Sequence, residues 1–430
     1  MDLELVTIGD ELLLGFTIDT NAAHLARELA AIGVRISRRS TVGDDPAIIA
    51  EAVREALHRT GAVITTGGLG PTADDRTKPA IGELFGRTMV MDEEILTALE
   101  QRWLKRFGVA LPASNRQQAM VPSDCTILSN RHGSAPGIWL EDNTGRWVAM
   151  LPGVPREMRG MLADTLLPRL RDRMSQGGAV AETVVRSRTL RTANIAESAL
   201  ADRLGELAGG VNGLSLAFLP GRDGVDLRVT VSGVPAKEAE RQLADAARLI
   251  DEKVSHFIYG SEDDDMAAIV LALCGERGAT VSVAESCSGG LLGGRFTSIP
   301  GSSAIFMGGV IAYHNDSKIR DLDVRPDVLA EFGAVSEETA RAMASGVRKR
   351  FGTTVGLSIT GVAGPGGGTP EKPVGTVWVA IDIEGVVQAV RATMPGDRNE
   401  MRYRSTQLVL DRLRRAFNAL PASAGWTADD

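Results

Sequence analysis

The segment AESCSGG at residues 284–290 holds the first side chains that suit covalent chemistry. It follows a short apolar run at residues 280–283, which we expect to be a buried strand. Ser286 would then lie at the carboxyl end of that strand, and Ser288 could cap a helix that follows. Backbone N–H groups at such a helix start stabilise an oxyanion, so the position suits a nucleophile. A small residue in a tight turn is the alternative interpretation.

A second segment, AYHNDSK at residues 312–318, offers partners for this serine. Tyr313 ends a predicted strand, and Lys318 follows where a helix would begin. A lysine has a pKa of about 10.4 in water and is a poor base unless burial or a neighbouring cation lowers that pKa. A solvated surface lysine is the alternative. The hydrolase elbow GxSxG is absent from the chain, so a histidine-based triad is not indicated.

The third segment, residues 360–378, is a glycine-rich loop between two predicted strands. Glycines allow backbone N–H groups to approach a phosphate closely, and Lys372 would add positive charge. The loop is neither a Walker A loop nor a GxGxxG motif, so a mobile connector is the alternative interpretation.

Near the N-terminus, TTGGLGPTADDRT at residues 65–77 reads as a strand that runs into a glycine-rich turn. The turn contains Gly67, Gly68 and Gly70, and two carboxylates, Asp74 and Asp75, follow it. Carboxylates beside a phosphate-binding turn suit a divalent metal ion that bridges phosphate oxygens. A capped turn with solvated acids explains the same residues without a ligand.

Alternating strand and helix patterns must position these segments. They occur in the first 165 or so residues and again from residue 266, and they predict parallel sheets with helices on both faces. We expect an α/β/α domain at residues 1–168, a small α+β connecting domain at 169–260, a second α/β/α domain at 261–420 and a loose tail at 421–430.

Composition limits the classes of function. The chain has 430 residues, 43% of them hydrophobic, and a net charge of −8, which argues against a general nucleic-acid binder. Its three cysteines form no CxxC pair, so neither a disulfide framework nor a thiolate zinc site is expected. Without a signal-like start or an apolar run of about 20 residues, we expect a cytoplasmic protein without membrane contact.

The C-terminal motifs together resemble one known family. AESCSGG, GSSAIFMGGVIAYHNDSK, GAVSEETARAM, ITGVAGPGGGTPEKPVGTVW and PGDR follow the order of the C-terminal domain of the CinA family, the nicotinamide-nucleotide amidohydrolases. The resemblance covers about 150 residues. It implies that Ser286 is the nucleophile and that Tyr313 and Lys318 assist it. The family usually has threonine at the position of Ser288 and often serine at that of His314, which puts only the pocket shape in question.

The resemblance implies hydrolysis of the carboxamide of nicotinamide mononucleotide, without a cofactor. Lys318, directly or through Tyr313, would take the proton of Ser286, and N–H groups at Ser288, Gly289 and Gly290 would hold the oxyanion. The remaining expected substrate-binding residues are Asn315, Gly364, Gly366, Gly367, Thr369, Lys372 and Arg398.

The N-terminal motifs resemble the molybdopterin-binding fold of the MoaB, MogA and MoeA proteins, and more closely the N-terminal domain of CinA proteins. Leu69 replaces the threonine of the molybdopterin proteins' GGTG, which counts against true molybdopterin binding. The resemblance implies a metal-dependent ADP-ribose pyrophosphatase. Asp44 and Asp75 are the expected metal contacts, with Asp10 as a weaker candidate.

Alternatives of other classes stay open at this point. A non-catalytic binding protein in competence and a molybdopterin-binding protein both fit the family resemblance. The expected partners are the two nucleotides, nicotinamide mononucleotide and ADP-ribose, with no nucleic acid. The family leads us to expect a homodimer.

Overall fold

The computed structural model describes residues 1–72, 74–176 and 183–419. The chain divides into two compact units, Met1–Arg186 with Val231–Arg241, and Ser187–Thr230 with Gln242–Asp430. The predicted tail at 421–430 lies outside the described residues.

The first unit is built on a six-stranded sheet with the order β2-β1-β3-β8-β7-β6. Strands β2, β1, β3 and β8 are parallel, and β7 and β6 are antiparallel to their neighbours. The strands are β1 (Asp2–Ile8), β2 (Arg35–Val42), β3 (Ala62–Thr66), β6 (Thr126–Leu128), β7 (Gly137–Glu141) and β8 (Trp147–Leu151). A separate two-stranded ribbon pairs β4 (Met89–Met91) with β5 (Met120–Pro122).

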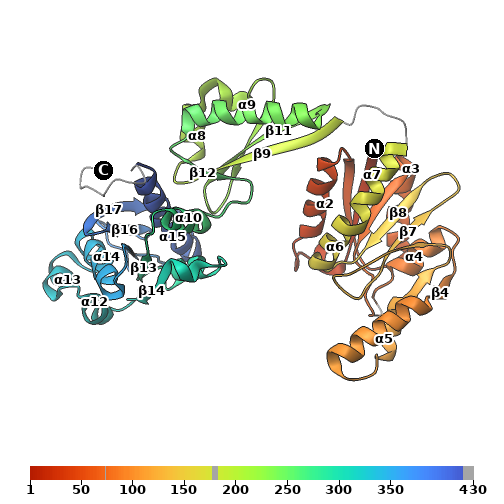
Figure 1. Cartoon of the computed structure of the whole chain (residues 1–430), viewed down its shortest axis with the longest axis horizontal. Coiled ribbons are helices and arrows are strands. Elements are labelled where there is room, and N and C mark those ends of the chain that lie inside the picture. Colours follow the sequence, from red (N-terminus) through yellow and green to blue (C-terminus); the bar gives the residue numbers. More distant parts are fainter. Residues whose placement is uncertain (73, 177–182, 420–430) are drawn as a thin grey trace. The chain divides into compact units, whose positions relative to one another are not determined.

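Helices cover both faces of this sheet (Figure 1). They are α1 (Asp10–Leu13), α2 (Thr20–Ala31), α3 (Pro46–Thr60), α4 (Thr77–Leu84), α5 (Glu93–Phe107), η1 (Ala113–Ala119), α6 (Pro155–Met161), η2 (Leu162–Leu166) and α7 (Leu167–Gln176). Leu3 and Leu5 of β1 pack with α2 and α6, whereas Val6 and Ile8 pack with α3 on the other face. The predicted three-layer α/β/α arrangement is therefore confirmed for this unit.

Local sequence explains where these helices begin and end. Asp45 accepts hydrogen bonds from the N–H groups of Ala47 and Ile48, and Pro46 occupies the first turn of α3. Gly61 ends α3 in the left-handed conformation, which costs glycine little.

A four-stranded sheet of order β10-β11-β9-β12 follows, as the predicted α+β pattern requires. Its elements are β9 (Thr183–Thr192), α8 (Glu197–Leu204), η3 (Gly205–Gly209), β10 (Ser215–Pro220), β11 (Val225–Pro235), α9 (Ala236–Val254) and β12 (Ile258–Ser261). Within the second unit, Asn194 donates a hydrogen bond to Asp411 (2.7 Å), and the Tyr403 hydroxyl donates one to Asp223 (2.6 Å).

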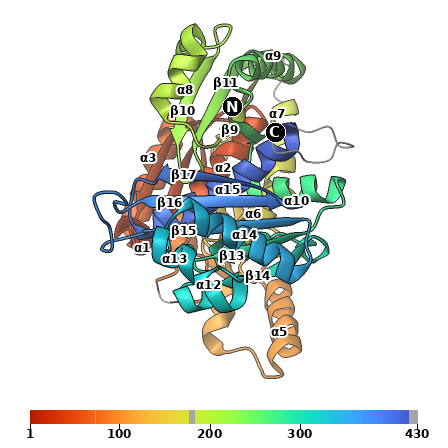
Figure 2. The same cartoon turned by 90° about the vertical axis from the view of Figure 1, so that its left-hand side faces the viewer.

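The C-terminal part of the second unit has a five-stranded sheet of order β14-β13-β15-β16-β17 (Figure 2). The strands are β13 (Val281–Glu285), β14 (Phe306–Ile311), β15 (Val355–Gly361), β16 (Thr376–Ile383) and β17 (Val386–Thr393). Strands β14, β13 and β15 run parallel, and β16 and β17 are antiparallel additions. The carboxyl ends of β13 and β15 therefore meet at one edge of the sheet.

Two layers of helices complete this second α/β/α arrangement. They are α10 (Met266–Glu276), α11 (Leu291–Thr297), η4 (Ser302–Ala304), α12 (Asn315–Leu322), α13 (Pro326–Phe332), α14 (Glu337–Phe351) and α15 (Arg398–Ala419). Helices α10 and α15 pack into the largest apolar cluster on one face, and α14 covers the other face. In the part of the chain that the structure describes, no helix is long and apolar enough to cross a membrane.

Candidate functional site

Ser286 lies directly after β13, at the carboxyl edge of the C-terminal sheet. Its N–H donates to the carbonyl of Ile359 on β15 (2.9 Å), so the hydrogen bonding between β13 and β15 holds its backbone in place. Only 8% of its surface is exposed. The serine is thus positioned by the sheet itself, and its hydroxyl faces a cavity described below.

The turn after Ser286 is held by the buried carboxylate of Glu285. This carboxylate accepts hydrogen bonds from the N–H groups of Gly290 (3.0 Å), Leu292 (3.0 Å) and Gly293 (2.8 Å), at the start of α11. The prediction that Ser288 caps this helix is wrong, because the cap residue is Gly290 and the buried Ser288 hydroxyl has no partner among the described residues.

The prediction of which N–H groups hold the oxyanion is also not supported by the structure. The N–H of Gly290 is taken by Glu285, and the N–H of Gly289 donates to the Ser286 carbonyl (3.1 Å). Neither these glycines nor Ser288 is among the residues that line the cavity. The sequence indicated a helix after Ser288, but it did not indicate the role of Glu285, whose position at the end of a buried strand was the available signal.

Lys318 is completely buried and reaches Ser286. Its Nζ atom lies 3.3 Å from the Ser286 Oγ atom and donates to the carbonyl of Ala312 (2.9 Å). Helix α12 presents the lysine after a cap by His314, whose Nδ1 accepts the N–H of Asp316 (3.3 Å). Burial lowers the pKa of Lys318 from its ordinary value of 10.5. The site thus holds a buried amine within hydrogen-bond reach of a hydroxyl, an arrangement suited to proton transfer between them.

Cys287, next to Ser286, also lines the cavity, and the sequence reasoning did not consider it as a site residue. Burial raises the pKa of its thiol to about 11. The thiol therefore stays protonated at neutral pH. The Lys318 ammonium nitrogen contacts the Ser286 hydroxyl (3.3 Å), which favours Ser286 as the nucleophile.

Tyr313 lies at the mouth of the cavity with 62% of its surface exposed. Its hydroxyl accepts a hydrogen bond from Arg398 Nη2 (3.0 Å), and only its backbone carbonyl contacts Lys318. Because Lys318 reaches Ser286 directly, the geometry supplies no relay through the tyrosine hydroxyl. Tyr313 instead orients Arg398, whose Nη1 also donates to the carbonyl of Gly364 (2.6 Å).

A cavity of about 280 Å³ surrounds the Ser286 hydroxyl. The predicted residues that line it are Ser286, Tyr313, Asn315, Lys318, Gly364, Gly366, Gly367 and Arg398. Thr369 and Lys372 do not line it, because they form a turn of their own and the Lys372 ammonium donates to the carbonyl of Phe332 (2.7 Å). Residues that the sequence analysis did not name, such as Thr360 and Val335, also line the cavity.

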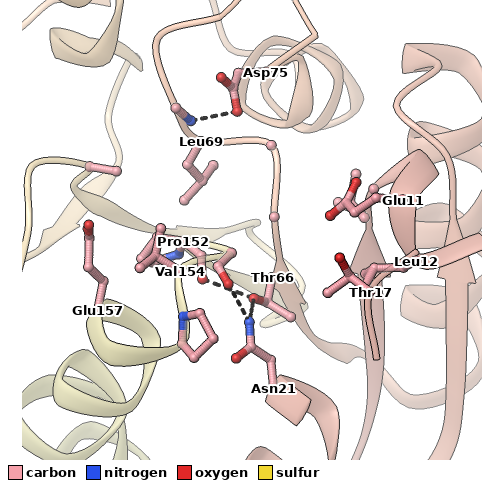
Figure 3. A pocket seen from close by; sticks show the side chains of 18 of the residues that line it. Glu11, Leu12, Thr17, Asn21, Thr66, Leu69, Asp75, Pro152, Val154 and Glu157 are labelled. Carbon is pink, nitrogen blue, oxygen red and sulfur yellow. Dashed lines mark hydrogen bonds between the residues drawn. The ribbon is translucent and has the colours of Figure 1, made fainter. Parts of the chain in front are cut away.

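A second cavity, of about 490 Å³, lies in the first unit at the carboxyl ends of β1 and β3 (Figure 3). Gly67, Gly68 and Gly70 all line it, and each leaves little room for a side chain. A Cβ atom at Gly67 would lie 2.1 Å from the carbonyl oxygen of Ile8, and one at Gly70 would lie 2.6 Å from the Asp75 carboxylate.

The two aspartates predicted as metal contacts both line this cavity. Asp75 holds the glycine turn, since its carboxylate accepts the N–H groups of Gly70 (2.7 Å) and Thr72 (2.8 Å) and the Thr72 hydroxyl. Asp44 accepts the N–H of Asp10 (3.1 Å), and Asp10, which does not line the cavity, accepts the N–H of Asp44 in return (3.4 Å). Burial, aided by nearby carboxylates, raises the pKa of Asp44.

These residues do not form a metal site on their own. Among the described residues, no group of three or more histidine, cysteine, aspartate or glutamate side chains could hold a metal ion. Both oxygens of Asp75 are already engaged by the turn. The residues present therefore do not fit a resident metal ion.

The charge and the unpaired polar atoms of this cavity indicate what it accepts. Every charged side chain among its described lining residues is a carboxylate: Glu11, Asp19, Asp44, Asp74, Asp75 and Glu157. Two buried side-chain oxygens in its wall, Asn21 Oδ1 and Gln118 Oε1, have no hydrogen-bond partner in the described structure. The cavity is rich in acceptors, so it suits cations and donor groups.

Comparison with known proteins places all three parts of the chain. Residues 263–417 match the family model "CinA C-terminal domain", residues 187–260 match "Damage-inducible protein CinA KH domain", and residues 4–172 match "Probable molybdopterin binding domain". These matches cover most of the described chain.

Individual relatives agree with these models. A CinA-like protein of Gemmatimonas aurantiaca is 70% identical over 430 residues, the whole of both chains. A CinA-like protein of Kosmotoga olearia is 38% identical over 417 residues, 97% of this chain and 99% of that one. A crystal structure titled competence/damage inducible protein CihA from Agrobacterium tumefaciens is 39% identical, with a TM-score of 0.35, over 36% of this chain and 93% of that one.

Proposed function

The chain belongs to the CinA family of competence/damage-inducible proteins, and from this premise we propose that its C-terminal site hydrolyses the carboxamide of nicotinamide mononucleotide. The observation that carries the proposal is the distance of 3.3 Å between Lys318 Nζ and Ser286 Oγ in a buried setting. A hydroxyl with a neutral amine beside it is suited to acyl transfer.

The reaction proceeds through an ester on Ser286. Neutral Lys318 takes the hydroxyl proton while the Ser286 oxygen attacks the carboxamide carbon. The lysine then gives that proton to the amide nitrogen, the C–N bond breaks and ammonia leaves. Water adds to the ester with Lys318 again as base, which releases nicotinate mononucleotide and restores the serine.

Other residues of the cavity bind the substrate. Arg398 lies at the glycine-rich loop and can pair with the phosphate, and Tyr313 keeps the guanidinium in place. Asn315 lines the same cavity and has an amide that can donate to the developing oxyanion, in place of the engaged N–H groups of Gly289 and Gly290.

The decisive experiment measures the release of ammonia and nicotinate mononucleotide when the purified protein is incubated with nicotinamide mononucleotide. We expect turnover by the wild type and none by Ser286→Ala. Ser302→Ala, a serine of η4 that does not line the cavity, is the matched control and should keep full activity. Equal turnover by wild type and Ser286→Ala would remove Ser286 from the mechanism.

A second function is favoured in the first unit by the charge of its larger cavity. A diphosphate such as that of ADP-ribose cannot enter a cavity whose described charges are all carboxylates unless a cation accompanies it. We propose that ADP-ribose is hydrolysed there and that the reaction needs an added divalent cation. AMP release that depends on added Mg²⁺ or Co²⁺ and stops with a chelator would support this, and cation-independent release would contradict it.

A further inference from the structure

A third cavity, of about 460 Å³, adjoins the acidic cavity of the first unit. The two share Gln118, Ser134, Val154 and Glu157 as lining residues. In Figure 3, Val154 and Glu157 lie across the acidic cavity from Glu11 and Thr17, so the third cavity opens from that side. We call it the arginine cavity.

The charge of the arginine cavity is opposite to that of its neighbour. Four arginines line it, from three different segments: Arg102 and Arg106 of α5, Arg131 of the loop before β7, and Arg156 of α6. Glu157 is the single carboxylate among its described lining residues, and it accepts a hydrogen bond from Asn130 (2.6 Å). The positive charge therefore exceeds the negative charge inside one concave site.

Three of these arginines are not used by the fold. Within the described residues, Arg106, Arg131 and Arg156 have no hydrogen bond or ion pair, and Arg106 merely lies over the Phe107 ring at 5.1 Å. Arg173 of the same unit, by contrast, is paired with the Glu141 carboxylate (2.8 Å). Arginines without a carboxylate partner that line one cavity are suited to a phosphate, which guanidinium groups bind through paired N–H donors.

Two aromatic side chains line the same cavity as the arginines. Trp103 and Phe107 are one helical turn apart on α5, with ring centroids 4.5 Å apart, and both line the cavity. The indole N–H of Trp103 is buried without a partner in the described structure. An indole face beside cations is the usual platform for a nucleic base.

Gln118 supplies an independent sign of a ligand. It is 4% exposed, lines both cavities, and its Oε1 has no hydrogen-bond partner among the described residues. An unpaired buried acceptor is costly, and a ligand that brings a donor removes this cost. All four arginines are exposed, so solvation alone would explain them, but it does not explain this unpaired buried amide.

We propose that the arginine cavity binds a nucleoside phosphate, with the phosphate on Arg131, Arg156 and Arg106, the planar base against Trp103, and a base or sugar donor on Gln118. The proposal adds a nucleotide-binding site to the ADP-ribose hydrolysis proposed for this unit. It rests on that proposed function only for the identity of the nucleotide. It is independent of the amidohydrolase site.

The test measures binding of AMP, adenosine and inorganic phosphate to the full-length protein by calorimetry and by quenching of tryptophan fluorescence. We expect AMP to bind at least tenfold more tightly than adenosine, and Arg131→Ala and Arg156→Ala each to weaken AMP binding about tenfold without changing adenosine binding. Trp103→Leu should weaken both ligands, and Trp103→Phe should restore affinity but not the quenching. Arg54→Ala, an exposed arginine of α3 outside the cavities, is the matched control.

The outcomes are distinct. AMP that does not bind at millimolar concentration, or that binds equally well to Arg131→Ala, Arg156→Ala and the control, overturns the proposal. Displacement of AMP by ADP-ribose shows that the nucleoside phosphate is part of that substrate. A protein that binds AMP through these arginines but does not cleave ADP-ribose refutes the second function and leaves the nucleotide site standing.

Discussion

The Nζ atom of Lys318 lies 3.3 Å from the Oγ atom of Ser286, and the lysine has no exposed surface. Its other contacts are the carbonyl oxygens of Ala312 and Tyr313, which are neutral acceptors. Among the described residues no ion pair to Lys318 is present, so nothing beyond these dipoles compensates its charge when it is protonated. Burial without a charged partner therefore lowers the pKa of Lys318 and makes proton loss easier than for a solvated lysine.

Replacing Lys318 by methionine should lower the rate of amide hydrolysis by about 10²–10⁴, the usual contribution of a general base. Methionine fills a similar volume, so circular dichroism should show an unchanged fold. Lys318→Arg should be equally inactive, because a guanidinium stays charged. Lys349→Met, an exposed lysine of α14, is the control. Wild-type turnover by Lys318→Met would exclude the lysine as base.

The pH dependence of turnover should follow the lysine. Because burial lowers the pKa of Lys318 from 10.5, the fraction of neutral amine grows as pH rises toward that lowered value. We expect kcat/KM to rise with pH and to level off below pH 10.5. Tyr313→Phe should keep the same midpoint, since the tyrosine hydroxyl contacts Arg398 and not the lysine. A midpoint displaced in Tyr313→Phe would place the tyrosine in the proton path.

Arg398→Ala should raise KM for nicotinamide mononucleotide about tenfold or more and leave that for the riboside, which lacks the phosphate, nearly unchanged. A lost charge-assisted contact of about 1.5–3 kcal/mol has this size. Arg325→Ala, an exposed arginine paired with Asp327, is the matched control. Equal increases for both substrates would indicate a disturbed loop instead, because Arg398 also holds the Gly364 carbonyl.

The strands and helices around the C-terminal site were largely predictable from the sequence. Apolar periodicity and capping residues are local signals, and α14 carries both, with Ser336 as its cap and buried residues at helical spacing. Strand β17 gives a weaker sequence signal than its hairpin partner β16, because most of its residues are only half-buried. The domain boundaries at 168 and 260 stay predictions.

The contacts inside the sites were less predictable because they depend on packing between distant segments. The sequence indicated Ser286 and Lys318 but not that the lysine reaches the serine without the tyrosine. It also assigned the helix cap to Ser288, since serine is a common cap. The cap residue is Gly290, and the Glu285 carboxylate at the end of the strand accepts N–H groups at the helix start. Likewise, the arginine cavity joins three segments that have no shared motif.

Glu285→Ala should destabilise the second unit by about 3 kcal/mol or more. The substitution removes a carboxylate that accepts three N–H groups and leaves these donors unpaired in a buried turn. Glu285→Gln keeps an acceptor oxygen and should cost roughly half as much. Urea unfolding monitored at Trp378, which lies on β16 of the same sheet, measures both. Equal stability of Glu285→Ala and the wild type would contradict this role.

The stability of the first unit should depend on Lys78, which is 3% exposed and donates to the carbonyls of Gln117 and Gln118 (both 3.1 Å). Burial lowers its pKa from 10.5 to about 8, with Asp75 opposing the change. Between these values the unfolded chain holds the proton more strongly than the folded one, so the free energy of unfolding rises with pH. From pH 7.5 to 9.5 this contribution is about 2 kcal/mol.

Lys78→Met has no titrating ammonium group at this position. Its free energy of unfolding should therefore lack this part of the rise with pH. Urea unfolding at pH 7.5 and 9.5, monitored through the buried Trp139 and Trp147 of the first sheet, gives the difference directly. Lys105→Met, an exposed lysine of α5, should behave as the wild type because a solvated ammonium has the same pKa in both states. If the free energy of unfolding of Lys78→Met rose with pH as much as that of the wild type, the rise would come from other titrating groups. Lys78 would then be charged in the folded protein without destabilising it.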